Sequence, residues 1–334
     1  MRVLVTGGAG YVGSVSVERL LGAGHEVTVL DSLVTGHRAA VAPGVELVAG
    51  SVGDPAVVGP LLRRRGIEAV LHCAARSLVG ESMREPELYE RENVDGGQAL
   101  LVAMQEAGVD RIVFSSTAAV YGSPERTPID EDDPLRPINP YGDTKLRFEA
   151  AMERAGRAAG LRAVTLRYFN VAGASVANGE LHRPETHLIP NLLRAVETGR
   201  PMTLFGADYP TPDGTAVRDY VHVEDLADAH LAALELTGST GPGLIVANLG
   251  SGSGFSVREV LAAAESTLGR AVPHVVGPRR EGDPPVLVAS YARARELLGW
   301  MPARGTLAEM IGSAWTWRHA HPGGYPTFES RDVR

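Results

Sequence analysis

Hydrophobic and polar positions in the first half of the chain alternate between short apolar runs and longer segments with helical spacing. The apolar runs predict strands at residues 3–6, 26–30, 45–49, 68–73, 111–116 and 163–169. The segments between them predict helices at residues 11–23, 54–65, 86–108 and 139–160. Strands that are apolar throughout and alternate with helices are typical of a parallel sheet with helices on both faces. We therefore expect a doubly wound α/β fold.

This order breaks down after residue 170. Residues 173–186 are polar and irregular, and residues 203–222 mix short apolar runs with Gly and Pro. Helical spacing returns at residues 187–198, 224–236, 257–268, 291–298 and 307–317, and a strand is expected at 244–249. The pattern predicts a sheet domain at 1–172, a smaller mixed α/β lobe mainly at 173–320, a segment at about 217–250 woven back into the sheet domain, and a loose tail at 321–334.

Composition excludes several classes of protein. The chain has 334 residues, of which 44% are hydrophobic, and a net charge of −8, so it is neither disordered nor strongly charged. Acidic residues outnumber basic ones by 40 to 32, which argues against nucleic-acid binding. The short basic run at 63–65 ends a predicted helix, where cations favour the helix dipole.

The single cysteine, Cys73, excludes an intramolecular disulfide and a cysteine-based zinc cluster, and we expect no metal. One free thiol also fits a reducing compartment. No segment approaches the ~20 apolar residues of a membrane span, and the apolar run at the amino terminus is shorter than the core of a secretory signal. We therefore expect a cytoplasmic protein that does not act on membranes.

A glycine-rich loop follows the first predicted strand and opens the first predicted helix. Its glycines are Gly7, Gly10 and Gly13. Without a Cβ, such residues let a pyrophosphate approach backbone N–H groups at a helix N-terminus. Asp31 ends the second strand, 31 − 13 = 18 residues later, where a carboxylate accepts hydrogen bonds from a ribose diol and repels a 2′-phosphate. The pattern predicts a Rossmann-type domain that binds NAD rather than NADP; the plainer alternative is a structural turn and a surface acid.

A second candidate motif combines three side chains. Tyr141 and Lys145 are four residues apart at the start of a predicted helix, so they share one helix face, and Thr117 ends the preceding strand. Oxidation of a carbinol needs a base for the hydroxyl proton, and lowering a phenol pKa from ~10 to near 7 takes roughly 4 kcal/mol. A nearby ammonium and a nicotinamide cation supply such stabilisation. The alternatives are a surface pair and an ordinary strand-end hydroxyl.

Longer motifs give a specific resemblance. The Gly-x-x-Gly-x-x-Gly spacing resembles the extended branch of the short-chain dehydrogenase/reductase superfamily. Residues 72–82, 113–122, 166–173 and 217–223 resemble the family of UDP-glucose 4-epimerases, also called UDP-galactose 4-epimerases, and the resemblance covers roughly residues 1–320. It implies that a UDP-sugar is oxidised at C4 to a 4-keto sugar, turns over in the site and is reduced on the opposite face, with NAD retained. Tyr141 is the implied base, Lys145 lowers its pKa and binds the nicotinamide ribose, and Thr117 orients or shuttles the proton.

The resemblance also implies binding residues. For NAD they are Gly7, Gly10, Tyr11, Val12 and Gly13 at the pyrophosphate, Asp31, Ser32, Leu33, Val34, Thr35 and Gly36 around the adenosine ribose, Ser51 and Val52 at the adenine, Cys73, Ala74, Ala75, Arg76 and Ser77 along the cofactor with Asn93 orienting that loop, and Ser115, Tyr141, Lys145, Tyr168 and Phe169 at the nicotinamide end. For the UDP-sugar they are Thr117, Tyr141, Asn170, His187, Leu188, Thr203, Phe205, Arg218, Arg280 and Asp283.

Plainer roles remain open for several of these residues. They are a salt bridge with Asp219 for Arg218, a solvated turn for residues 279–283, hydrophobic core for Leu188 and Phe205, helix capping for His187, and a small buried side chain for Cys73. Ser51 also stands where many relatives have an aspartate that reads the adenine amino group, and Leu287 stands where side-chain size influences the width of the sugar pocket.

Other functions are compatible with the same fold. A 4,6-dehydratase needs an acid and a base after the catalytic threonine, whereas Ala118 and Ala119 carry no protons to exchange. A net sugar-nucleotide oxidoreductase, a 4-epimerase of a UDP-N-acetylhexosamine, UDP-pentose or UDP-uronate, and a non-catalytic sensor of NAD and UDP-sugar stay open. The resemblance further implies a homodimer through the helices at 86–107 and 140–159.

Overall fold

The computed structural model describes residues 1–280 and 283–326. Glu281 and Gly282 of the predicted 279–283 turn, and the predicted tail from residue 327 onward, lie outside the described residues. No helix in the described ranges combines the length and the apolar character that crossing a membrane requires.

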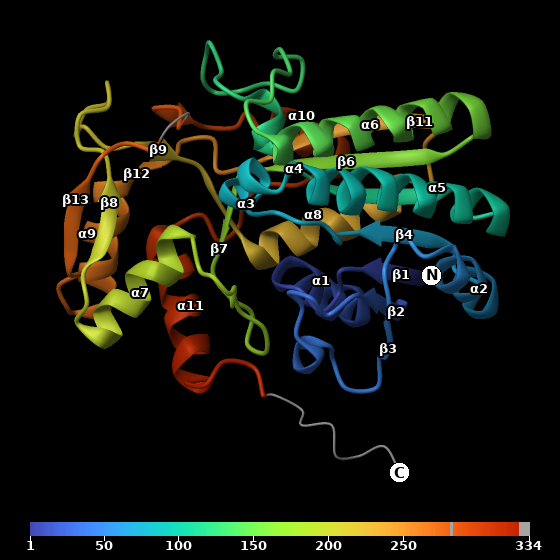
Figure 1. The fold of residues 1–334 in the computed structure, drawn as a ribbon, viewed down its shortest axis with the longest axis horizontal. Helices are drawn as coiled ribbons and strands as arrows, with labels where there is room; N and C mark the ends of the chain where they lie inside the picture. The colour runs from blue at the N-terminus through green and yellow to red at the C-terminus, as the bar shows by residue number, and fades with distance from the viewer. Residues whose placement is uncertain (281–282, 327–334) are drawn as a thin grey trace.

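A seven-stranded parallel sheet forms the larger part of the molecule (Figure 1). Its spatial order is β3-β2-β1-β4-β5-β6-β11, so the chain starts in the middle, winds to one edge and then returns to build the other half. The strands are β1 (Arg2–Thr6), β2 (Glu26–Asp31), β3 (Glu46–Ala49), β4 (Ala69–His72), β5 (Arg111–Thr117), β6 (Arg162–Tyr168) and β11 (Gly243–Leu249). This order confirms the predicted Rossmann-type doubly wound α/β fold.

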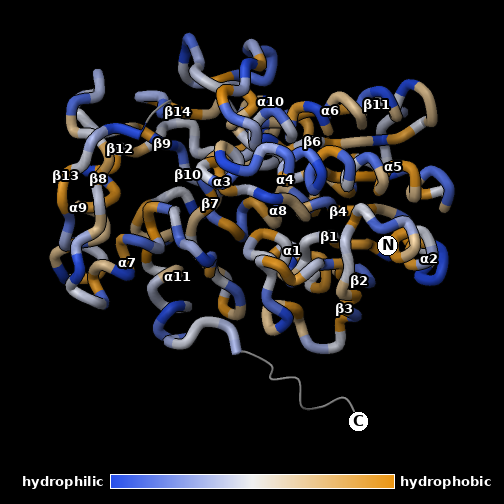
Figure 2. The backbone as a smooth tube through the Cα atoms, viewed as in Figure 1, coloured by the Kyte–Doolittle hydropathy of each residue, from blue (hydrophilic) through white to orange (hydrophobic). Residues whose placement is uncertain are grey.

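Helices cover both faces of this sheet, and the apolar strands lie between them (Figure 2). One layer contains α1 (Tyr11–Gly22), α8 (Val223–Leu236) and α10 (Ala292–Leu298). The other contains α2 (Pro55–Arg65), α5 (Gly96–Ala107) and α6 (Pro140–Ala159). Residues from α8 and β11 therefore pack in the sheet domain, although they follow the first part of the smaller lobe in the sequence.

The helix predicted over 86–108 is confirmed as one continuous helical segment over 86–107, but a π-helical turn that was not predicted interrupts its α-helical spacing. The segment consists of α4 (Pro86–Tyr89), the π-helical turn η2 (Glu90–Asp95) and α5, and the short helix α3 (Val79–Arg84) precedes it. A π turn adds a residue to the helical turn and changes which side chains face the sheet. Here it carries Asn93, whose amide oxygen accepts from the Arg76 backbone N–H at 2.8 Å and whose amide nitrogen donates to the Arg76 carbonyl at 3.1 Å.

The smaller lobe has its own core, built mainly from three helices. Its helices are α7 (Leu188–Thr198), α9 (Val257–Leu268) and α11 (Leu307–Ala320). Its strands pair as β7 (Asn170–Ala172) with β10 (Tyr220–His222), β8 (Met202–Phe205) with β13 (His274–Gly277), and β9 (Val217–Arg218) between β12 (Phe255–Ser256) and β14 (Val286–Leu287). The 3₁₀ turns η1 (Arg38–Ala40) and η3 (Ala118–Tyr121) complete the described elements.

The described start of the predicted tail is packed rather than loose. Tyr325 is buried, its ring stacks on His37 at 4.9 Å between centroids, and its hydroxyl donates to the Gly179 carbonyl at 3.0 Å. Trp317 lies against the same ring at 5.2 Å. The Pro, Gly and charge content of this stretch suggested a loose tail, but the apolar ring of Tyr325 packs against the rest of the protein. Residues up to 326 therefore belong to the folded body.

Candidate functional site

The glycine loop lies where β1 ends and α1 begins, beside the end of β4. Gly7 has φ 72°, and a Cβ at this position would lie 2.5 Å from the Ala74 backbone nitrogen. A Cβ on Gly13 would lie 2.1 Å from the Gly7 carbonyl oxygen. Gly10 is the N-cap of α1, and within the described residues no side chain caps this helix. The cradle therefore fits a phosphate group at the N-terminus of α1.

Asp31 ends β2 with its carboxylate turned back toward this loop. It accepts hydrogen bonds from the backbone N–H groups of Ala9 at 2.9 Å and Leu33 at 2.8 Å. Burial raises the pKa of Asp31, and these two hydrogen bonds oppose that shift. Leu33 has φ 59°, the left-handed conformation that non-glycine residues rarely adopt, and a Cβ on Gly36 would lie 2.7 Å from the carboxylate. The 31–36 turn thus wraps tightly around one acid.

The remaining residues of this turn and of the strand ends beside it differ in exposure. Ser32, Val34, Thr35 and Ser51 are exposed and Val52 is buried. The Ser51 hydroxyl accepts from the Gly53 N–H at 3.1 Å. Because β2 and β3 are parallel neighbours, Asp31 at the end of β2 and Ser51 just after β3 lie at the same edge of the sheet.

The loop after β4 contains residues 73–77 and is held by a side chain from the π turn. Besides its two bonds to Arg76, Asn93 donates to the Thr144 hydroxyl on α6 at 3.1 Å. Thr144 directly precedes Lys145, so one amide connects the predicted cofactor loop to the helix that carries the predicted base. Cys73 is half-buried, its Sγ lies 3.2 Å from the Ser115 hydroxyl, and burial raises its pKa to about 11. These contacts suit a small structural thiol rather than a reactive one.

The three predicted catalytic residues come together at the end of β5 and the start of α6. Asn139 caps α6, because its side chain accepts from the Gly142 N–H at 2.8 Å. Thr117 lies close enough to Tyr141 for its hydroxyl to favour the phenolate. The Lys145 ammonium donates to the Ser115 carbonyl at 2.8 Å and lies 6.0 Å from the centre of the Tyr141 ring. A strand end and the first two turns of one helix thus assemble the set.

The protein's own groups shift the pKa of Tyr141 upward, whereas the predicted lowering depends on a nicotinamide cation together with the Lys145 ammonium. Burial raises the pKa of Tyr141, and the nearby Thr117 hydroxyl opposes that shift. Burial also lowers the pKa of Lys145 to about 8. The reason for the difference is solvation, because an enclosed phenol loses the water that stabilises its anion.

Two buried networks support this end of β5. The Ser115 hydroxyl lies 2.8 Å from His230 Nε2, and His230 Nδ1 lies 3.1 Å from the Ser16 hydroxyl. The Ser116 hydroxyl donates to Glu149, which also forms a buried ion pair with Arg167 at 2.6 Å. Residues on α1, α6, β6 and α8 therefore fix the two residues that precede Thr117.

The predicted nucleotide-binding residues gather in the smaller lobe. Arg218 forms an ion pair with Asp283, and the Arg280 guanidinium lies 4.2 Å from the centre of the Phe205 ring. The alternative of an Arg218–Asp219 salt bridge is wrong, because the buried Asp219 carboxylate instead accepts from Ser251, Gly252 and Ala289.

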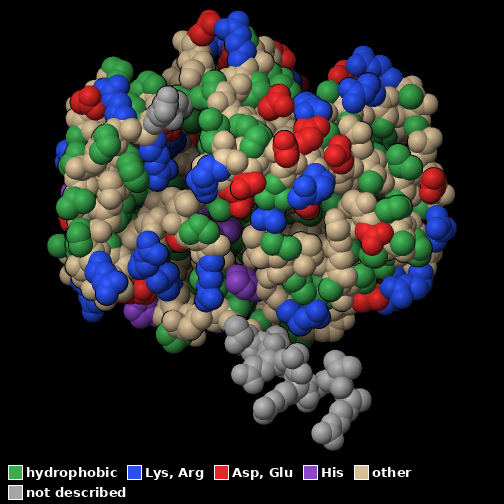
Figure 3. Space-filling model, in the orientation of Figure 1, with side chains coloured by type: hydrophobic (Ala, Val, Ile, Leu, Met, Phe, Trp, Pro, Cys, Tyr) green, Lys and Arg blue, Asp and Glu red, His purple; other side chains and the backbone are tan. Residues whose placement is uncertain are grey.

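The other predicted residues of this region lie on the elements around these pairs. Asn170 and Thr203 are exposed, Leu188 is half-buried at the start of α7, and Phe169 is buried beside the half-buried Tyr168. Phe205 is 36% exposed, so it is not a core residue. In the space-filling view, basic and histidine side chains lie along the depression between the sheet domain and this lobe (Figure 3).

Two predicted contacts have an unexpected geometry. The Tyr11 hydroxyl donates to the Gly173 carbonyl at 2.6 Å, so this side chain joins α1 to the smaller lobe. His187 does not cap α7 with its side chain; its Nδ1 instead lies 2.7 Å from Glu180 Oε1 and 3.2 Å from Glu185 Oε1.

The sequence profile of the NAD dependent epimerase/dehydratase family matches residues 3–250 of the chain. The chain belongs to this family. A UDP-glucose 4-epimerase of Lactobacillus helveticus is 50% identical over 328 residues, which are 97% of this chain and 99% of that protein.

Solved structures of the family agree with this comparison. One of a UDP-glucose 4-epimerase has a TM-score of 0.95 at 44% identity and covers 98% of this chain and 100% of its own. The UDP-glucose-4-epimerase from Stenotrophomonas maltophila, solved with bound NAD and formylated UDP-arabinopyranose, has a TM-score of 0.92 at 40% identity and covers 97% and 99%. These likenesses confirm the predicted resemblance and NAD as the cofactor of the family.

Several residues that shape this NAD-dependent site are absent from the predicted set. Gly8 belongs to the same loop as the three predicted glycines, and a Cβ there would lie 2.7 Å from the Val29 side chain. The run of glycines in the sequence could have indicated that Gly8 also belongs to the site. His230 and Glu149 gave no such signal, because their partners are 115 and 33 residues away.

Proposed function

We propose that the protein interconverts UDP-glucose and UDP-galactose by reversible, NAD-dependent epimerisation at C4. One observation carries the proposal: Thr117, Tyr141 and Lys145 meet at the carboxyl end of β5, in a chain that matches a UDP-glucose 4-epimerase over 97% of its length. Ligands of doubly wound sheets bind at this edge, beside the point where the strand order reverses between β1 and β4.

In this proposal Tyr141 takes the proton of the sugar 4-hydroxyl as the hydride leaves C4, and the resulting 4-keto sugar is reduced on its other face after turning. The Thr117 oxygen accepts from the Ala119 N–H at 3.1 Å, which leaves its hydrogen to be donated to the phenolate or the sugar oxygen. Bound NAD⁺ would supply the hydride acceptor and a positive charge that favours the phenolate. Since burial raises the pKa of Tyr141, such a charge is what the base requires.

NAD binding is assigned to the edge formed by the first strands. The pyrophosphate would lie on the cradle at Gly7, Gly10 and Gly13, and Asp31 would hold the adenosine ribose through the lone pairs that its two backbone hydrogen bonds leave free. Lys145 is close enough to the carboxyl end of β5 to reach the nicotinamide ribose.

The nucleotide part of the substrate is assigned to the smaller lobe. Arg218 and Arg280 suit a diphosphate, because guanidinium groups pair with phosphate oxygens. Asp283 would bind the uridine ribose while its ion pair keeps Arg218 in place. Asn170 would assist at the diphosphate, and His187, Leu188, Thr203 and Phe205 would line the nucleotide pocket. Turnover of the keto sugar then requires a firm hold on the nucleotide and few directional contacts to the sugar.

Neighbouring chemistries are weaker candidates. Ala118 and Ala119 form the turn after Thr117 and offer neither acid nor base for a dehydration. Leu287 on β14 pairs with Arg218 on β9. The size of the Leu287 side chain would therefore influence the width of the pocket for the sugar. Activity on a UDP-N-acetylhexosamine, UDP-pentose or UDP-uronate is therefore the second candidate. The predicted cytoplasmic location stays a prediction.

The test is to incubate the protein with UDP-galactose and to separate UDP-glucose by chromatography, with Tyr141→Phe in parallel. We expect a fixed product ratio without net NADH, and loss of turnover in the variant. Further reactions with UDP-N-acetylglucosamine, UDP-pentoses and UDP-uronates show which sugars the pocket accepts. Binding of NAD and UDP-sugars without conversion of any would contradict the proposal and favour the sensor.

We further propose a homodimer through α5 and α6. A groove between these helices is lined by Leu101, Val102, Ala151 and Ala155 among other residues, and Val102 is 56% exposed. Sedimentation at micromolar concentration tests this: a monomer would contradict it, and Val102→Glu should weaken a dimer without touching the catalytic set.

A further inference from the structure

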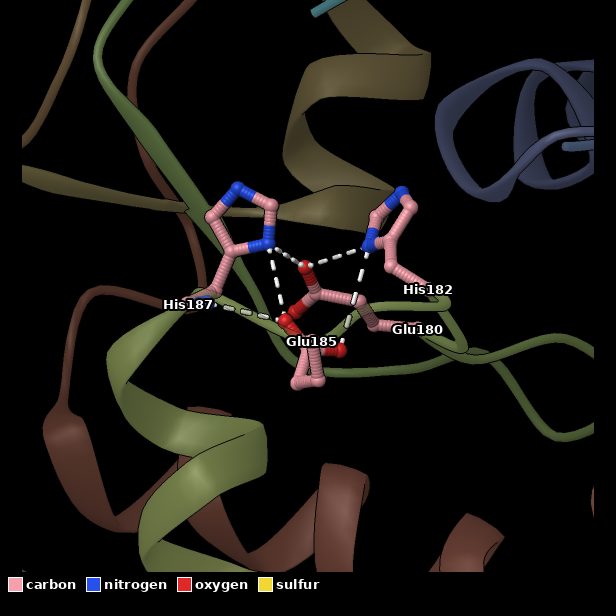
Figure 4. A group of neighbouring side chains, drawn as sticks. All are labelled: Glu180, His182, Glu185 and His187. Atoms are coloured by element: carbon pink, nitrogen blue, oxygen red, sulfur yellow. Dashed lines mark hydrogen bonds and ion pairs between the residues drawn. The ribbon is translucent and has the colours of Figure 1, made fainter. Parts of the chain in front are cut away.

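Four side chains outside the catalytic set converge in the loop that leads into α7. They are Glu180, His182, Glu185 and His187, and Figure 4 shows them pointing toward one another. Two carboxylates and two imidazoles from eight consecutive residues thus share one small volume, and one atom from each lies within 4.8 Å of the others. None of these groups is needed for the proton transfer proposed above.

These atoms lie close enough together to share one ion. Glu180 Oε1 lies 2.7 Å from His187 Nδ1 and 3.2 Å from His182 Nδ1. The two Glu185 oxygens lie 3.2 Å from His187 Nδ1 and 3.9 Å from His182 Nδ1. Ligand atoms at about 2.0–2.2 Å from a tetrahedral ion are separated by about 3.3–3.6 Å. Two of the four separations, both 3.2 Å, are close to that range, and small side-chain rotations would bring the other two, 2.7 and 3.9 Å, toward it.

Hydrogen bonding alone leaves this cluster incompletely satisfied. Nδ1 of His182 is buried and, among residues 1–280 and 283–326, has no partner with hydrogen-bond geometry, although Glu180 Oε1 lies 3.2 Å away. The Glu180 and Glu185 side chains are only 9% and 11% exposed, so two negative charges are largely removed from water. A protonated His187 compensates part of this negative charge. Burial lowers the pKa of His187, but the Glu180 and Glu185 carboxylates raise it more, to about 10.

We propose that Glu180, His182, Glu185 and His187 bind a divalent transition-metal ion, with Zn²⁺ the best match. Two ionised carboxylates and two neutral imidazoles neutralise the charge of the ion, and imidazole ligands favour zinc over magnesium or calcium. Four protein ligands fill a tetrahedral shell, so the ion has a structural role and leaves no position for substrate.

The location explains what such an ion would do. The loop that carries the cluster also contacts the dinucleotide side of the molecule, where His37 Nε2 lies 3.1 Å from the Leu181 carbonyl. Its last ligand, His187, is the N-cap of α7, and we assign both His187 and the adjacent Leu188 to the nucleotide pocket, so this inference rests in part on the proposed function. A bound ion therefore fastens the loop between the NAD-binding edge and the start of α7.

The experiment measures zinc directly in the full-length protein. After chelator treatment and dialysis, the chain is titrated with ZnCl₂ by calorimetry, and its metal content is determined by mass spectrometry. We expect one Zn²⁺ per chain and a higher melting temperature with zinc. The variant His182→Gln should bind at least about 100-fold more weakly, because loss of a direct ligand exceeds the 10–100-fold cost of outer-shell changes. His274→Gln, at an exposed position on β13, is the matched control and should bind like the unaltered chain.

Titration with Co²⁺ keeps the test informative if a variant does not fold. In the unaltered chain we expect the intense visible absorption of tetrahedral cobalt, which ZnCl₂ should abolish by displacement. Absence of stoichiometric binding, an octahedral cobalt spectrum, or equal zinc affinity in His182→Gln and the unaltered chain would overturn the proposal and leave the ion-pair network as the explanation. Epimerase turnover is measured separately, so this result and the test of function are independent.

Discussion

Three deeply buried histidines should make the protein sensitive to mild acid. His72, His222 and His230 are at most 2% exposed. Burial lowers the pKa of His72 and His230 to about 3 and that of His222 to about 4. Histidine in the unfolded chain titrates near ~6.5, so the unfolded state binds more protons as the pH falls below that value. The folded state therefore loses stability as the pH falls from about 6.5 to about 3.

Linkage gives the size of this loss. Between pH 7 and pH 5, each of these histidines lowers the free energy of unfolding by about 2 kcal/mol, or about 6 kcal/mol together. That is a large part of the 5–15 kcal/mol that stabilises typical domains. Carboxyl groups whose pKa is raised by burial, such as Asp31, act in the opposite direction and offset part of the loss.

The histidine contribution can be isolated by substitution. Urea unfolding is followed by circular dichroism at pH 7 and pH 5 for the unaltered chain and for His230→Gln. The drop in unfolding free energy should be about 2 kcal/mol smaller in the variant. Ser16→Ala removes a hydrogen bond of His230 but keeps the imidazole, so it should retain the full drop. Equal drops in the unaltered chain and His230→Gln would refute the reasoning.

Three further predictions concern the cofactor edge and its support. Gly13→Ala, whose Cβ would lie 2.1 Å from the Gly7 carbonyl oxygen, should abolish NAD binding measured by calorimetry. Gly22→Ala in the same helix places its Cβ in open space and should leave the NAD affinity unchanged. Similar NAD affinities for the two variants would show that the glycine cradle is not the NAD site. Glu149→Gln leaves a buried guanidinium without its ionic partner and should cost roughly 3–5 kcal/mol in urea unfolding, and a loss below about 1 kcal/mol would mean that the ion pair is dispensable. Asp31→Asn removes a charged acceptor, and a hydrogen bond to such a group is worth about 1.5–3 kcal/mol. The variant should bind NAD more than tenfold more weakly and should prefer NAD over NADP less than the unaltered chain does. An unchanged preference for NAD over NADP, measured by competition, would contradict the assignment of Asp31 to the ribose.

Much of the fold was predictable because it depends on local patterns. The alternation of apolar strands and helices, together with the cap at Asn139, located the elements on which the site is built. The helix predicted over 86–108 formed, but its π turn at Glu90–Asp95 was missed, because helical spacing alone does not distinguish an α turn from a π turn. Asn93 favours the π turn by bonding to Arg76, a contact that forms only when the β4 loop lies beside it.

The sequence by itself determined the chemistry that is available: a glycine loop, an acid 18 residues later, and a tyrosine and a lysine on one helix face. These motifs depend only on the spacing of residues within one or two neighbouring helices and strands. Tertiary structure alone decided how that chemistry is supported and shifted. It placed His230 behind Ser115 and Glu149 beneath Ser116, raised the pKa of Tyr141 by enclosing it, and turned His187 toward Glu180. Burial and contacts between distant segments set these properties, and neither is encoded in the local pattern of the chain.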